Sequence, residues 1–193
     1  MNFLAHAHLS GNNSNILVGN FMADAVKGNP ALKYNDDILK GIILHRHIDT
    51  FTDAHPIHKQ SRKLIRNHFG KFSGIVIDIY YDHFLAKNWH QYSDEPLHDF
   101  TQMVYKELSK RLLIIPNHTK RILPFMISQN WLLNYANFKG LDNVFRGMDR
   151  RTKHISGMQN AVEVLKNNYT RLNDDFNTFY PELIQFVSNY WLL

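Results

Sequence analysis

The chain has 193 residues, 44% of them hydrophobic and 13% aromatic, which is a globular composition and excludes a disordered chain. No segment reaches the roughly 18 uninterrupted apolar residues that a membrane span needs, and the first residues lack the features of a signal peptide, so we expect a cytoplasmic protein. The absence of cysteine excludes disulfides and thiolate ligands, and the formal net charge of +5 favours acidic partners such as nucleic acid, nucleotides or an acidic protein.

Apolar residues recur mainly at steps of three and four, and the strict alternation typical of strands is scarce. No stretch has the composition of a domain linker. We therefore predict an all-α fold, a single-domain helical bundle over residues 1–193. In chain order the expected helices are 14–27, 36–51, 56–68, 72–89, 95–112, 118–136, 141–151 and 155–189, the last with a break near Asn173.

The first predicted helix, 14–27, carries Asp24 among small and apolar residues. Asn20 lies one turn earlier and could hydrogen-bond it. An ordinary exposed aspartate is an equally good interpretation. Before this helix, His6 and His8 would share a face in an extended segment but would diverge by about 200° on a helix, so at least one of them is expected to be structural.

The helix predicted over 36–51 places a histidine and an aspartate on its apolar stripe. Advancing 100° per residue puts His45 and Asp49 on the same side as Ile38 and Ile42. A histidine and an aspartate one turn apart can share a metal ion, or the carboxylate can orient the imidazole. A buried hydrogen-bonded pair and an exposed ion pair are the structural alternatives.

The helix predicted over 56–68 has one basic face, formed by Lys59, Arg62, Lys63 and Arg66. Most such faces are simply solvated. The functional alternative is a surface that docks an acidic partner beside the site.

The helix predicted over 72–89 is apolar on nearly all sides, which is typical of a buried helix. Asp78 and Asp82 nevertheless stand one turn apart on it, and His83 follows directly. Two carboxylates that close repel each other unless a proton or a cation lies between them. A structural ion pair with an arginine is the alternative.

Matched carboxylates and imidazoles on separate apolar helices favour a metal centre built from facing side chains, as helical bundles build them. Oxygen and nitrogen ligands suit manganese, magnesium, iron or zinc. Other chemistries fit less well, because the chain has no glycine-rich phosphate loop, no Gly-x-Ser-x-Gly elbow and no His-Glu-x-x-His motif.

Several short blocks, taken together, resemble the acyl carrier protein phosphodiesterase family. They are the opening Met-Asn-Phe-Leu-Ala-His-Ala-His-Leu, residues 19–24 with 26–30, residues 41–49 with Thr52-Asp53, residues 78–86, and the Gly147-Met148 and Phe179-Tyr180-Pro181 regions. The resemblance covers nearly the whole chain. It implies an HD-domain-like helical fold and a metal-dependent hydrolase that removes 4′-phosphopantetheine from holo-acyl carrier protein, with manganese as the expected metal.

The chemistry of phosphodiester hydrolysis suggests roles for individual side chains. Asp78 or Asp49 would orient or deprotonate the attacking water, and Arg46 would pair with the phosphate through its planar fork. Acyl carrier proteins are acidic, so a basic surface is a plausible docking feature. The metal-site candidates are Asp24, His45, Asp49, Asp82 and His83, and the candidates for substrate or partner contacts are His6, Lys59, Arg62 and Arg66.

Two other functions compete with this one. The first is a small-molecule phosphohydrolase that acts on a nucleotide or a coenzyme A fragment. The second is a non-catalytic module that binds an acidic partner. A nucleic-acid partner ranks lowest, because the aromatic residues read as core rather than as stacking platforms.

Overall fold

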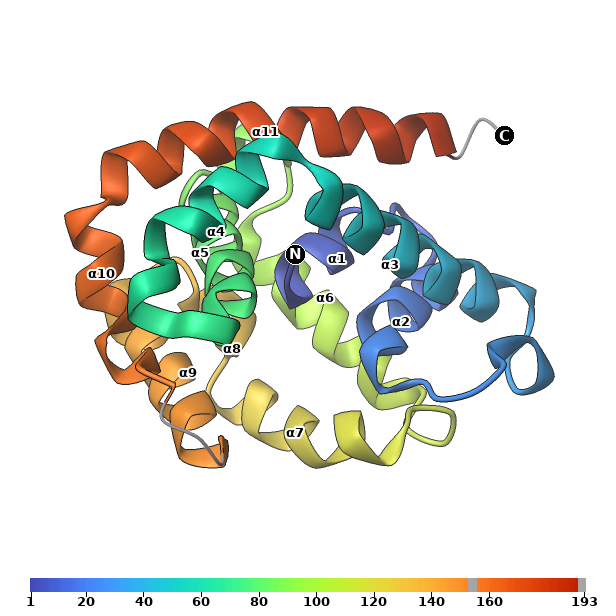
Figure 1. The fold of residues 1–193 in the computed structure, drawn as a ribbon. Helices are drawn as coiled ribbons and strands as arrows, with labels where there is room; N and C mark the ends of the chain where they lie inside the picture. The colour runs from blue at the N-terminus through green and yellow to red at the C-terminus, as the bar shows by residue number, and fades with distance from the viewer. Residues whose placement is uncertain (153–155, 191–193) are drawn as a thin grey trace.

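The computed structural model describes residues 1–152 and 156–190, and within these ranges it contains helices and no strand (Figure 1). The all-α prediction is confirmed, whereas the single-domain and HD-domain-like assignments stay predictions. None of the described helices is long and apolar enough to cross a bilayer. The α-helices are α1 (Phe3–His8), α2 (Ser14–Met22), α3 (Asp36–Ala54), α4 (Pro56–Phe69), α5 (Ser73–Lys87), α6 (Leu97–Lys110), α7 (Asn117–Ser128), α8 (Trp131–Asn134), α9 (Phe138–Arg151), α10 (Ala161–Asn167) and α11 (Tyr169–Tyr190).

The positions at which α3 and α4 begin follow from the local sequence. The side chain of Asn35 caps α3 by accepting a hydrogen bond from the backbone N–H of Ile38 at 3.2 Å. Asp36 and Asp37 lie in the first turn, where the helix dipole favours negative charge. Pro56 occupies the first turn of α4, a position where its missing N–H costs nothing.

The predicted helices differ from the structure in several places. The helix expected over 14–27 ends at Met22, so that Asp24 lies in the short 3-10 helix Ala23–Ala25 that follows. The helix expected over 118–136 is two helices, α7 and α8, because Asn130 adopts a left-handed conformation with φ of 45°. The helix expected over 155–189 breaks at Asn168 rather than near Asn173, and residue 155 lies outside the described residues. Helix α1 was not predicted, since six residues are too few to show a helical period.

Helices α2 and α3 cross in very close contact at two glycines. A Cβ atom on Gly41 would lie 2.1 Å from the carbonyl oxygen of Ile16, and one on Gly19 would lie 2.2 Å from that of Ile38. Only glycine fits where the backbone of one helix approaches the other so closely. This contact fixes the end of α2, with Asp24 just beyond it, against the middle of α3, which carries His45.

Gly41→Ala is expected to lower the free energy of unfolding by about 1–3 kcal/mol, because the added methyl group forces two helix backbones apart. Gly74→Ala is the matched control. Its Cβ would meet the side chain of Arg62 at an ordinary 3.5 Å, and alanine favours the helix by up to about 1 kcal/mol. Urea unfolding of both variants checks this. Equal stability of the two variants would contradict the close contact.

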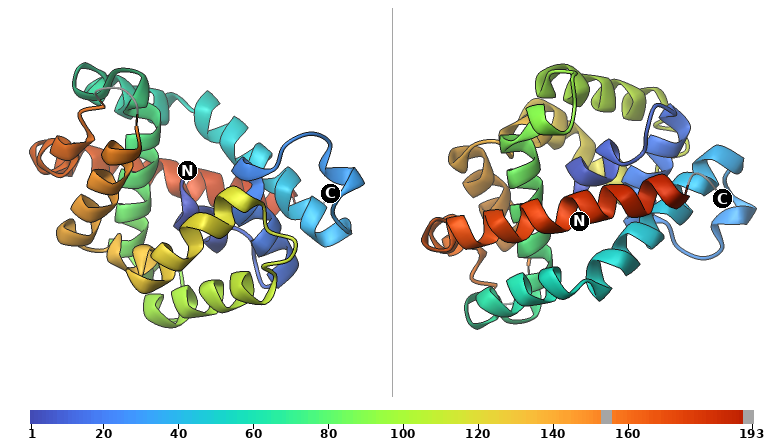
Figure 2. Two further views of the ribbon diagram at one scale, coloured as in Figure 1. Left: turned by 90° about the horizontal axis from the view of Figure 1, so that it is seen from below. Right: turned by 90° about the horizontal axis from the view of Figure 1, so that it is seen from above.

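The remaining helices enclose α1. It packs against α2 and α5, and Figure 1 shows it in the interior, with α7 along one side of the molecule and α11 along the other. Figure 2 shows α11 lying across α3, α4 and α5, which it contacts. The side chains of α11 that face these helices form an apolar stripe and are fully buried. They are Leu172, Phe176, Phe179 and Tyr180. The site described next lies where α1 meets α3.

Candidate metal centre

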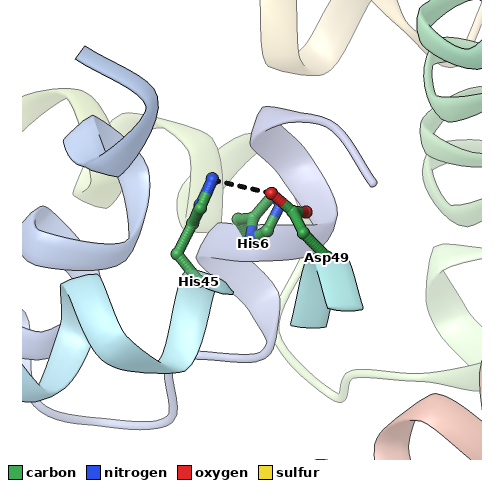
Figure 3. Close-up of side chains that lie close together, drawn as sticks. All are labelled: His6, His45 and Asp49. Atoms are coloured by element: carbon green, nitrogen blue, oxygen red, sulfur yellow. Dashed lines mark ion pairs between the residues drawn. The ribbon is translucent and has the colours of Figure 1, made fainter. Parts of the chain in front are cut away.

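His6, His45 and Asp49 bring three metal-ligating groups together at the contact between α1 and α3. The Nε2 atom of His6 lies 3.2 Å from one carboxylate oxygen of Asp49, and the Nε2 atom of His45 lies 3.0 Å from the other. Figure 3 shows both rings directed toward this carboxylate. Asp24 Oδ1 lies 3.1 Å from the same His45 nitrogen. The ligand atoms of the three residues all lie within 4.8 Å of one another, so a single divalent ion could contact all of them.

The hydrogen bonds of Asn20 fix the protonation of His6. The Asn20 amide nitrogen donates to the His6 carbonyl oxygen at 2.9 Å and to the Ser10 hydroxyl at 3.0 Å. Its oxygen must therefore face His6 Nδ1, at 2.8 Å, and accept the N–H from it. The neutral ring then presents a lone pair at Nε2. This is the arrangement of a histidine whose other nitrogen binds a metal ion.

A lone pair at His6 Nε2 facing a carboxylate calls for a cation between them. The ring is buried, and its Nε2 atom makes no hydrogen bond although an Asp49 oxygen lies only 3.2 Å away. Burial, together with the neighbouring His45, lowers the pKa of His6, which favours the neutral ring. Two electron-rich atoms at this distance repel each other, so the residues present fit a divalent ion.

The two carboxylates beside His45 control the charge of the cluster. Burial opposes a charged ring, but hydrogen bonds to Asp24 and Asp49 outweigh it and raise the pKa of His45 to about 9. Burial likewise opposes the Asp49 carboxylate, but the hydrogen bond from His45 holds its pKa well below the usual range. The hydrogen bond from His45 lowers the pKa of Asp24. Both carboxylates are therefore ionised near neutral pH and available to a cation. His45 would have to lose its proton to bind that cation, so metal binding at this site would release a proton.

A polar cavity of about 200 Å³ opens beside the cluster. Asp24, Asp49, Asp53 and Asp78 all line it, so the described residues surround this space with carboxylates. We call it the polar chamber.

Asp78 occupies the side of the polar chamber formed by α5. It accepts a hydrogen bond from His58 Nε2 at 3.0 Å, and the amino group of Met1 lies 3.2 Å away. Burial opposes the charge of Asp78, but the amino group and His58 lower its pKa. Asp78 is therefore an ionised acceptor facing the same space as Asp49.

Asp82 and His83 do not join the cluster. The fully buried carboxylate of Asp82 accepts the backbone N–H groups of Leu4 at 2.7 Å and Ala5 at 3.2 Å, so it caps α1. His83 contacts the carbonyl oxygen of Tyr135 at 2.7 Å through Nδ1. Sequence spacing placed both on a buried helix, but their hydrogen-bond partners are structural, and we assign neither to the metal.

The other predicted residues are placed as follows. His6 belongs to the cluster rather than to a partner surface, whereas His8 diverges from it and bonds the Tyr180 hydroxyl at 2.8 Å. Arg46 is exposed on α3 and is not among the described residues that line the polar chamber, so we no longer assign it to the phosphate. The basic residues Lys59, Arg62 and Arg66 are all exposed on α4.

Sequence reasoning missed His58 and gave Asn20 the wrong neighbour. His58 was readable as part of the buried stripe of α4, since it precedes Ser61, Ile65 and Phe69 at steps of three and four. Asn20 was considered as a partner of Asp24, but it bonds His6 instead. The bond to His6 could not be predicted without α1.

An all-α protein with two imidazoles and a carboxylate clustered beside a chamber lined by further carboxylates has a site that is compatible with a divalent metal ion. The model of the acyl carrier protein phosphodiesterase family matches residues 1–183, and this chain belongs to that family.

Relatives named acyl carrier protein phosphodiesterase match almost their whole length. The Photorhabdus laumondii protein is 35% identical over 193 residues, which is 98% of this chain and 96% of the relative. The Yersinia pestis protein is 33% identical, covering 96% of each chain. A Salmonella paratyphi A protein is 34% identical, covering 95% of this chain and 96% of the relative. No solved structure matches the chain.

Proposed function

We propose that this protein hydrolyses the phosphodiester bond of holo-acyl carrier protein. Water adds to phosphorus and the bond from phosphorus to the serine oxygen breaks. The serine oxygen takes up a proton, which yields apo-acyl carrier protein and free 4′-phosphopantetheine. The family match over residues 1–183 carries this proposal, and the cluster of His6, His45 and Asp49 supports it. We also propose a cytoplasmic location, as expected from the sequence.

His6, His45 and Asp49 would hold the metal, with Asp24 beside them, and manganese is the ion we propose. When bound, such an ion neutralises charge on the phosphate oxygens and lowers the pKa of water. Asn20 keeps His6 in the tautomer that presents Nε2. Asp78 faces the polar chamber as an ionised acceptor and would orient the attacking water and accept its proton.

Incubation of holo-acyl carrier protein with the enzyme and manganese is expected to remove the mass of the phosphopantetheine group, as mass spectrometry would show. A chelator should stop the reaction, and added Mn²⁺ should restore it. An intact carrier protein alongside turnover of nucleotides would instead favour a small-molecule phosphohydrolase. Binding of the carrier protein without any turnover would favour a non-catalytic module.

We propose that the basic face of α4 docks the acidic carrier protein. Its residues are exposed, and His58 on the buried face of the same helix bonds Asp78 in the polar chamber. The guanidinium of Arg62 lies over Gly74, next to Ile75, which lines the chamber. A partner held on this face would therefore stand beside the site.

Charge reversal at Lys59 and Arg66 together is expected to raise KM for holo-acyl carrier protein about tenfold at low salt, with little change in kcat, because docking precedes the chemistry. The defect should shrink as salt is added. Lys106→Glu, an exposed lysine on α6, is the matched control. A similar rise in KM for the double variant and for Lys106→Glu would show that the carrier protein docks elsewhere.

A further inference from the structure

An apolar cavity of about 370 Å³ adjoins the polar chamber and has no role in the chemistry proposed above. The walls are formed by the start of α1, the end of α2, the start of α5, and helices α7, α8 and α9. Phe21, Met22, Trp131 and Val144 are buried parts of this lining. Protein interiors are normally close-packed, and this volume falls in the range of roughly 300–1,000 Å³ that small-molecule sites occupy.

The cavity and the chamber share part of their walls. Asn2, Asp24 and Ile75 line both. Asp24 also contacts His45 of the metal cluster at 3.1 Å. A group attached to a phosphate held at the cluster could therefore pass Asp24 into the apolar cavity.

We infer that this apolar cavity receives the pantetheine arm, which stays attached to the phosphate when the serine oxygen leaves, an inference that rests on the proposed function. Of the two groups esterified to the phosphate, the carrier protein is far too large for a cavity of about 370 Å³, whereas the arm is thin and flexible. The arm carries a dimethyl-branched carbon and a two-carbon thiol end, which suit apolar walls. Its two amides need a few polar partners, and Asn2, His118 and Thr119 supply polar groups along the lining.

The test fills the cavity without touching the metal cluster. Ile122 on α7 and Met148 on α9 line the cavity and are only partly buried, so each can be replaced by tryptophan with little demand on the core. Asn143→Trp adds the same bulk on the exposed face of α9 and is the control. Thermal melting establishes that all three variants fold.

Two readouts are taken from the full chain with manganese. Pantetheine, which lacks the phosphate, is titrated by calorimetry, and apo-acyl carrier protein is measured by mass spectrometry. We expect the wild type and Asn143→Trp to bind pantetheine, and Ile122→Trp and Met148→Trp to bind it at least about tenfold more weakly. The same two variants should lose kcat/KM on holo-acyl carrier protein by a similar factor.

The outcomes separate the two proposals. If the wild type forms no apo-acyl carrier protein, the proposed function fails. If it does form the apo protein, and the cavity variants bind pantetheine and turn over substrate as the control does, then the arm lies elsewhere and this inference is overturned.

Discussion

Asp49→Ala is expected to lower the manganese-dependent turnover of holo-acyl carrier protein by at least about 10³-fold, the equivalent of the several kcal/mol that a bound metal supplies. The physical reason is the position of this carboxylate. One oxygen faces His6 and the other faces His45. Its removal leaves two imidazoles with no anion between them. It also takes away one of the three ligands of the proposed metal ion.

The matched variant is Asn20→Ala, which leaves every proposed ligand in place. Among the proposed ligands Asn20 bonds His6, through Nδ1 and the backbone carbonyl oxygen, so metal affinity should fall about 10–100-fold, as it does when the partner of a ligating histidine is lost. Raising the manganese concentration should therefore restore the turnover of Asn20→Ala but not that of Asp49→Ala.

Calorimetric titration with Mn²⁺ and a turnover assay at several metal concentrations measure both effects. Asp36→Ala, at the exposed start of the same helix, serves as the control for loss of a carboxylate. Manganese should also raise the Tm of the wild type and not that of Asp49→Ala, since a ligand stabilises only the state that binds it. Turnover of Asp49→Ala within tenfold of the wild type would show that the cluster is a structural ion pair.

The sequence predicted the elements that carry strong local signals. Helices α3 and α4 begin where the Asn35 cap and Pro56 place them, and the 100° advance correctly put His45 and Asp49 on one face of α3, within 3.0 Å of each other. These features depend only on residues within a few positions of each other. Helical periodicity and capping both arise from interactions over that short distance along the chain.

The composition of the site depends on contacts between distant segments, which spacing does not encode. Asp82 satisfied every sequence criterion for a ligand, being a carboxylate on a helix that is apolar all round. A buried carboxylate needs a partner, but the sequence cannot tell a metal ion from the N-terminus of another helix. The partner here is α1, a six-residue helix with no detectable period. Because α1 was missed, His6 was also missed as a member of the cluster.

Asp82→Ala is expected to lower the free energy of unfolding by about 2–4 kcal/mol, since it leaves two backbone N–H groups buried without an acceptor. Leu4 and Ala5 donate these bonds, and the side chain of Asn2, the residue at the cap position of α1, makes no capping bond. Urea unfolding in the presence of a chelator measures the effect without any contribution from metal.

Asp82→Asn separates a helix cap from a metal ligand. Burial raises the pKa of Asp82 to about 7, well above its value in an unfolded chain, roughly 3.9. Between these values the folded state binds more protons than the unfolded state, so the wild type loses stability as the pH rises toward 7. Asparagine does not titrate, so the stability of Asp82→Asn relative to the wild type should improve between pH 5 and pH 8.

The affinity of Asp82→Asn for Mn²⁺ should stay within a few-fold of the wild type, because the carboxylate of Asp82 faces α1. A large loss of metal binding in Asp82→Asn would return this residue to the ligand set.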